Sequence, residues 1–173
     1  MRTIGATAIV VLAAVMSASG AELPSRKAGL WEVKTTFENR NGAGLAVQQC
    51  IDASTDQTMQ SSAGPLAQAA CSKREVQKSG NIVTIDSTCS LGGKTATSHA
   101  VITGSFDSAY TMTVTSESDA LPGGKMTMTM AAKWLGPCTA DQKPGDMIMG
   151  NGLKLNILEI QKRGPSQGVP LPP

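Results

Sequence analysis

The sequence has few aromatic residues and only one histidine. The first shortage limits how its core can be filled, and the second limits the catalytic sites that it can form. Only five of the 173 residues are aromatic, so bulky rings can fill little of a core. His99 is the sole histidine, and a Ser-His-Asp or Cys-His arrangement would need it beside a free nucleophile. His99 falls in a predicted strand, which favours a structural role for this residue over a catalytic one. No Gly-x-Ser-x-Gly motif and no spacing of carboxylates suited to acid/base catalysis occurs, so we expect no catalytic residue and no enzyme.

Charge is also scarce. The formal net charge is +2, and Arg2 near the amino terminus supplies one unit of it. Such a balance provides no basic field to attract nucleic acid or an anionic membrane surface. No apolar run reaches the roughly 20 residues that a membrane-spanning helix needs. We therefore expect neither nucleic acid nor a membrane span.

The amino terminus has the pattern of an export signal. Arg2 precedes an uncharged, mostly apolar run from Ile4 to Met16, and Ser19-Gly20-Ala21 places small residues at the cleavage positions. This run is too short for a membrane anchor and fits a signal peptide. We predict cleavage after Ala21 and a periplasmic location.

Four cysteines follow the predicted leader: Cys50, Cys71, Cys89 and Cys138. An even number in an exported protein predicts disulfides, and the wide gaps do not suit a zinc site. Cys71 and Cys89 flank a hairpin centred near Gly80, which favours a Cys71–Cys89 bridge and leaves Cys50–Cys138. A three-residue turn over 79–81 would place the first pair directly opposite, and a two-residue turn over 79–80 would offset it by one. The alternative joins Cys50 to Cys71 and Cys89 to Cys138.

Apolar and polar residues alternate along many segments, as in half-exposed β-strands. The clearest segments are 31–37, 110–115 and 126–134, and weaker ones are 44–51, 72–78, 82–89, 95–104 and 153–160. Glycine-rich turns separate them, which indicates antiparallel hairpins. The predicted fold is all-β: a small antiparallel barrel or sandwich of about eight strands with two disulfides. A short helical insert is expected from Asp52 or Ser54 through Met59, with a further turn over 65–70.

The chain divides into three predicted parts. Residues 1–21 form the signal peptide, residues 22–163 a single β domain, and residues 164–173 a disordered tail. The tail contains four prolines with glycine, serine and glutamine, a composition that gives a chain end little to pack against a domain.

Several short segments resemble one family. They are Gly29-Leu30-Trp31-Glu32-Val33, Gln49-Cys50, the Cys71 to Cys89 hairpin, and Gly136-Pro137-Cys138. Together they resemble the bacterial exported domain-of-unknown-function family 3617, over residues 29–138. The resemblance implies a periplasmic protein without an assigned activity, and it implies no catalytic residues. Residues 139–163 lie beyond it and have no predicted role.

A row of methionines is the most unusual pattern in the domain. Met126, Met128 and Met130 project from one face of a predicted strand, ~6.6–6.8 Å apart. Methionine is an adaptable core filler, so core packing is the simplest interpretation. A second is a cavity in which these residues and Met112 bind a small apolar molecule. A third is Cu(I), which soft thioethers suit, although a straight row needs a cross-strand partner such as Met112.

These observations leave three functions open. The expected one is a non-catalytic binding module for a small apolar ligand, with no cofactor and no metal. The alternative is a structural or interaction protein of the cell envelope, whose partner is another envelope protein and not a small molecule. The third is Cu(I) handling by the methionine-rich strand.

Overall fold

The structure is a computed structural model that describes residues 23–38, 44–60, 71–91 and 93–163. The predicted signal peptide, the predicted turn over 65–70 and the predicted tail lie outside these residues, so they stay predictions.

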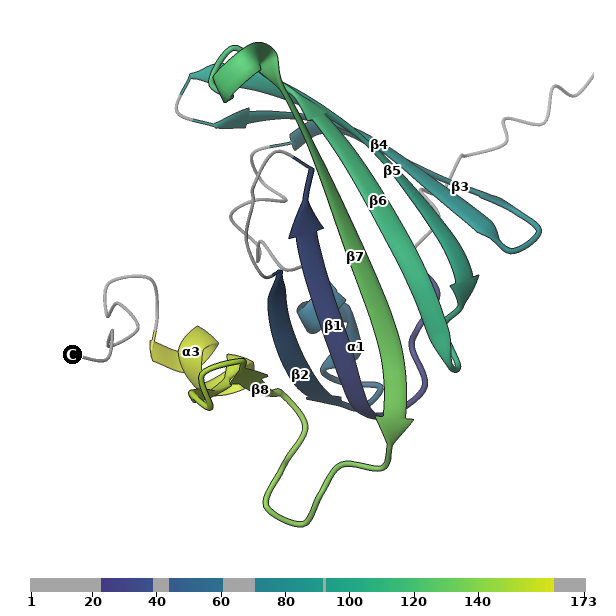
Figure 1. The fold of residues 1–173 in the computed structure, drawn as a ribbon, viewed down its shortest axis with the longest axis vertical. Helices are drawn as coiled ribbons and strands as arrows, with labels where there is room; N and C mark the ends of the chain where they lie inside the picture. Colours follow the sequence, from purple (N-terminus) through teal and green to yellow (C-terminus); the bar gives the residue numbers. More distant parts are fainter. Residues whose placement is uncertain (1–22, 39–43, 61–70, 92, 164–173) are drawn as a thin grey trace, which may run out of the picture.

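Nine antiparallel strands form one sheet in the order β3-β4-β5-β6-β7-β1-β2-β8-β9 (Figure 1). The strands are β1 Gly29–Phe37, β2 Leu45–Ile51, β3 Cys71–Ser79, β4 Ile82–Leu91, β5 Lys94–Ser105, β6 Ala109–Glu117, β7 Lys125–Gly136, β8 Asp146–Met149 and β9 Lys154–Asn156. Helix α1 spans Asp56–Gln60, the 3-10 turn η1 spans Pro122–Gly124 and helix α3 spans Ile157–Arg163. No helix of the described ranges is long and apolar enough to cross a membrane.

The predicted all-β antiparallel class, with its helical insert and two disulfides, is confirmed. Strands β3 and β9 each pair on one side only, so the sheet is open and is neither a closed barrel nor two facing sheets. Strands β3 to β7 follow one another as antiparallel neighbours, whereas β1 pairs with both β7 and β2. Strand β1 therefore lies between β2, which follows it in the sequence, and β7, which comes much later.

One face of the sheet carries the core. Trp31 of β1 lies opposite Trp134 of β7, and Ala132 of β7 lies opposite Tyr110 of β6. Met59 of α1 packs with Trp31 and Ala132 in the same buried cluster, and α1 lies behind β1 and β2 in Figure 1. The face that bears Trp31 is termed the inner face, and the opposite face the outer face.

The hairpin between β3 and β4 differs in detail from both predicted turns. Its turn residues are Gly80 and Asn81, because Ser79 pairs directly with Ile82. That register alone would offset the two cysteines by one residue. An irregularity at Ser72 inserts the extra residue, and Cys71 comes to lie opposite Cys89. The bulge therefore restores the alignment that the bridge needs.

Both predicted disulfides are present. Cys71 bonds to Cys89 within the hairpin, and Cys50 of β2 bonds to Cys138 after β7. None of the described cysteines is free. The four cysteines therefore act as crosslinks.

The last predicted strand, over 153–160, is wrong in its second half. Strand β9 ends at Asn156, and α3 begins at the next residue. The side-chain oxygen of Asn156 accepts hydrogen bonds from the backbone N–H groups of Leu158 and Glu159, at 3.1 and 3.3 Å. This is the geometry of a helix amino-terminal cap, so Asn156 ends the strand and starts the helix. Strand β8 was not predicted.

Candidate functional site

The inner face has a tightly packed end around Trp31, here termed the packed end. The Trp31 side chain is 0% exposed, and its ring centroid lies 5.8 Å from that of Tyr110, which stacks on Phe106 at 4.8 Å. Trp134 packs against the same cluster. Four of the five aromatic residues thus gather here, and the scarce rings fill one end of the face.

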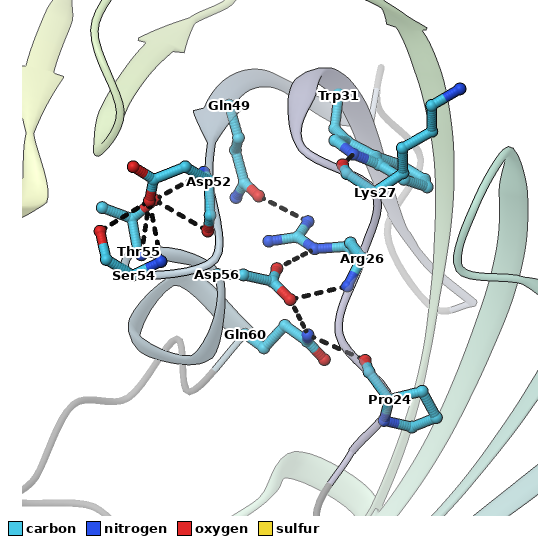
Figure 2. Close-up of polar contacts among 10 residues, drawn as sticks. All are labelled: Pro24, Arg26, Lys27, Trp31, Gln49, Asp52, Ser54, Thr55, Asp56 and Gln60. Atoms are coloured by element: carbon cyan, nitrogen blue, oxygen red, sulfur yellow. Dashed lines mark hydrogen bonds and ion pairs between the residues drawn. The ribbon is translucent and has the colours of Figure 1, made fainter.

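A buried ion pair closes the packed end. The segment before β1 carries Arg26, and α1 carries Asp56; these residues are 6% and 2% exposed. Arg26 donates from its backbone N–H to Asp56 Oδ2 and from Nε to Oδ1, both at 2.7 Å, and from Nη1 to Gln49 Oε1 at 2.9 Å (Figure 2). Gln60 Nε2 donates to Asp56 Oδ2 at 2.7 Å and to the Pro24 carbonyl at 3.2 Å. The pair therefore joins β2, α1 and the first described residues.

The Arg26–Asp56 cluster was missed by sequence reasoning. The two residues are 30 positions apart, and neither belongs to a recognisable motif. Arg26 Nη2 is buried, and within the part of the chain that the structure describes it has no hydrogen-bond partner by distance and angle. Tyr110 borders the pair: burial raises the pKa of its hydroxyl, although the neighbouring Arg26 guanidinium acts in the opposite direction. The packed end thus contains a buried polar cluster beside its aromatic residues.

The turn before α1 is capped as predicted. Asp52 Oδ1 accepts hydrogen bonds from the backbone N–H groups of Ser54 and Thr55, at 3.0 and 2.9 Å, and from both of their hydroxyls. The bonds from the Ser54 and Thr55 hydroxyls lower the pKa of Asp52. Asp52 thus fixes the chain direction that brings Asp56 and Met59 over the inner face.

The other end of the inner face carries the predicted methionines and is termed the methionine end. Across β6 and β7, Met112 lies opposite Met130, Val114 opposite Met128 and Ser116 opposite Met126. The structure therefore brings all four predicted ligand-binding methionines together. All four side chains are half-buried. In contrast, Val83 and Ile102, in line with Met112 on β4 and β5, are each 2% exposed.

His99 lies on the outer face, away from both ends. Its Nδ1 is 2.7 Å from Asp86 Oδ1 on the adjacent strand, and both side chains are about half exposed. The pair lines a shallow depression of about 410 Å³. Among the described residues, no group of three His, Cys, Asp or Glu side chains could hold a metal ion. The surroundings supply no cysteine nucleophile, since the described cysteines are bridged.

Comparison with known families gives one match, over residues 26–138, to a family described as proteins of unknown function, DUF3617. The chain belongs to DUF3617. No curated protein and no solved structure matches it significantly. The DUF3617 segment begins at Arg26 and ends at Cys138. It therefore contains the buried ion pair, both disulfides and the methionine end, whereas β8, β9 and α3 lie beyond it.

The segment that carried the resemblance to DUF3617 has a packing role. Gly29 has a φ of +131°, which side-chain-bearing residues rarely adopt. A Cβ at this position would lie 2.6 Å from Trp134 Nε1 and would also overlap the carbonyl oxygen of Gly136. Two residues later, Trp31 is the centre of the core. This part of the DUF3617 segment therefore helps to form the packed end.

The residues after the DUF3617 segment cover an edge of the sheet. Strand β8 pairs with β2, and Asp146 at its start is 2% exposed. Asp146 accepts hydrogen bonds from Asn156 Nδ2 at 2.8 Å and from the Lys143 N–H at 3.0 Å, and pairs with Lys154 Nζ at 3.0 Å. Burial alone would raise the pKa of Asp146, but these three donors outweigh it and the pKa is lowered. The ionised carboxylate therefore holds β8 and β9 together.

Proposed function

We propose that this DUF3617 protein is a non-catalytic binding module of the periplasm. It holds a small apolar ligand against the methionine end of the inner face. The observation that carries this proposal is the incomplete burial of five apolar side chains that lie side by side on two strands: Met112, Val114, Met126, Met128 and Met130. Covering apolar surface is worth about 25 cal/mol per Å², so an apolar occupant would be stabilised there.

The nature of the side chains supports a binding role. Methionine is unbranched and flexible, and it adapts to the shape of an apolar partner. The adjoining packed end is held by the Arg26–Asp56 pair and by the Cys50–Cys138 bridge. A rigid end beside an adaptable surface suits a module that takes up a small molecule without unfolding.

Native mass spectrometry tests the proposal. The mature protein is purified without detergent from the envelope of its own bacterium and measured before and after extraction with organic solvent. We expect an added mass that the solvent removes and that an apolar fluorescent probe then replaces. A protein that carries no ligand and binds no probe, yet crosslinks to an envelope protein in cells, would contradict the proposal in favour of an interaction role.

The periplasmic location has two supports: the leader pattern over residues 1–21 and two disulfides, which persist in oxidising compartments. Cell fractionation with amino-terminal sequencing tests it. We expect a periplasmic protein that begins at Glu22, and a cytoplasmic protein that retains Met1 would contradict it.

Cu(I) handling is a second candidate, because Met112 lies opposite Met130 and supplies the cross-strand thioether that a single row lacks. Replacing Met112, Met128 and Met130 by leucine separates the two functions. Leucine keeps the surface apolar but removes the sulfur. Apolar binding retained in the triple variant, with no Cu(I) binding to the wild type in competition with a Cu(I) chelator, would exclude the copper function.

A further inference from the structure

The two faces of the sheet differ in charge. The strands of the described chain carry five carboxylates, and their register places all five on the outer face: Glu32, Glu75, Asp86, Glu117 and Asp146. The charged residues that these strands place on the inner face are all basic: Arg74, Lys78 and Lys94. The inner face therefore presents positive charge without strand carboxylates to neutralise it.

The helix adds no net charge to this balance. Asp56 of α1 is the carboxylate that packs over the inner face, and it is already paired with Arg26 at 2.7 Å. Arg74 and Lys78 are exposed, and neither forms an ion pair with another described residue. Lys73, on the outer face of the same strand, is paired with Glu75.

Arg74 begins a polar row that crosses the inner face. In register across the sheet, Arg74 lies opposite Ser87, followed by Ser98 and Ser116 on the next two strands. All three serines are half-buried, and the hydroxyls of Ser98 and Ser116 share a hydrogen bond of 2.9 Å. The Arg74 guanidinium and the hydroxyl of the neighbouring Ser87 can together donate several hydrogen bonds to one anionic group.

The next row toward the packed end is apolar. It consists of Val76, Ile85, Ala100, Val114 and Met128. The row after it contains the half-buried Met112 and Met130 and the buried Val83 and Ile102, and it has Lys78 at its edge. A polar row with a cation thus borders two apolar rows, and the inner face is amphipathic along its strands.

We propose that the ligand of the inner face is a single-chain amphiphile with a carboxylate head, that is, a long-chain fatty acid. Its chain lies over the half-buried side chains of the two apolar rows, which include Met128 and Met130, and its carboxylate accepts hydrogen bonds from Arg74 and from the adjacent Ser87 hydroxyl. This inference rests on the proposed function of the same face and adds the chemistry of the head. Charge complementarity supports it, because Arg74 and Lys78 on this face have no ion-pair partner among the described residues and none of the described strand carboxylates lies there.

Binding of matched ligands to the mature protein tests the inference. Myristate and myristyl alcohol have the same chain and differ in the head, and their affinities are measured by displacement of an apolar fluorescent probe. We expect myristate to bind about tenfold more tightly, which corresponds to about 1.4 kcal/mol. Arg74→Gln should remove this preference, because the binding of myristate weakens far more than that of the alcohol.

Lys73→Gln is the matched control, since it removes one positive charge from the outer face of the same exposed strand. It should leave the preference for myristate intact. Equal affinity of the wild type for acid and alcohol, equal effects of the two substitutions, or tighter binding of a phosphate-headed single chain would overturn the inference and leave the proposed apolar binding in place. Binding of no ligand at all would overturn both.

Discussion

Arg26 and Asp56 form a buried ion pair in which one carboxylate accepts hydrogen bonds from both the backbone and the side chain of the arginine, each at 2.7 Å. This arrangement fixes the residues before β1 to α1. Since α1 also contributes Met59 to the core, the ion pair fixes the position of α1 over the packed end. The charges thus have a structural role that depends on both partners.

Asp56→Ala should destabilise the protein by about 3–5 kcal/mol, because it leaves the Arg26 guanidinium buried without its counter-charge. Urea unfolding followed by tryptophan fluorescence measures the change. The double variant Arg26→Met with Asp56→Leu should recover much of the loss. Glu75→Gln, which breaks an exposed pair with Lys73, is the control and should change stability by under about 0.5 kcal/mol. Equal effects of Asp56→Ala and Glu75→Gln would contradict this role.

The two disulfides should differ in their contribution to stability. Cys50–Cys138 joins residues 88 apart, and Cys71–Cys89 joins residues 18 apart. Because the entropy removed from the unfolded chain grows with loop length, replacing the long-range pair by alanine should cost about 1.4 kcal/mol more than replacing the hairpin pair. Unfolding of the two double variants in urea checks this. A larger loss from the hairpin pair would mean that native contacts, and not loop length, decide the order.

Met128→Gln should weaken binding of an apolar probe roughly tenfold, because the amide loses hydrogen bonds to water when the probe covers it. Met128→Leu should bind normally. Thr113→Gln places the same amide on the exposed outer face of β6 and serves as the control. Probe titration measures all three, and urea unfolding confirms that they are folded. An equal loss in the Met128→Gln and Thr113→Gln variants would exclude the inner face as the binding surface.

The pH dependence of stability should report Asp146. Its folded-state pKa lies below the ordinary value of 3.8, so the unfolded chain takes up the proton first as the pH falls. The stabilisation is complete well above the unfolded-state pKa and is lost as the pH falls below it through the lower folded-state pKa of Asp146. Asp146→Asn should be less stable than wild type at pH 6, and the gap should narrow at pH 3. Asn156→Ala removes a donor and should move the pKa of Asp146 upward in an NMR titration. A constant gap would contradict this assignment.

Gly29→Ala should be more damaging than Gly80→Ala, although both glycines have positive φ angles. At Gly80 nothing lies within 4 Å of an added Cβ, so the cost is the conformational one of about 1–2 kcal/mol. At Gly29 the Cβ would also overlap Trp134 and Gly136. Urea unfolding of the two variants compares them. Equal losses would show that the β1–β7 contact adapts to a side chain.

The sequence predicted which residues share a face more reliably than which strands are neighbours. Alternation along single strands placed Met126, Met128 and Met130 together, and the structure confirms that they share one face with Met112. Alternation carried no information about the pairing of β1 with β7, because that pairing joins segments about a hundred residues apart. The contacts of the packed end depend on this pairing and were therefore not predicted.

Local irregularities were also invisible in the sequence. The run Lys73-Arg74-Glu75 is polar throughout, so its alternation is blurred and the extra residue at Ser72 leaves no sign. The burial of Arg26 depends on Asp56 in a different element, and an isolated arginine before a strand is usually exposed. The disulfides were nevertheless predicted correctly, because Cys71 and Cys89 flank one hairpin and lie close together in any of its registers.

An open sheet has two edge strands, and a second copy of the chain could pair with either of them. On one side β9 is three residues long and leads directly into α3. On the other side β3 is nine residues long, and four of its side chains are charged: Lys73, Arg74, Glu75 and Lys78. Charges on a sheet margin oppose edge-to-edge growth into polymers. The edge strand that is long enough to pair with a second copy is thus also the one whose charges oppose such pairing.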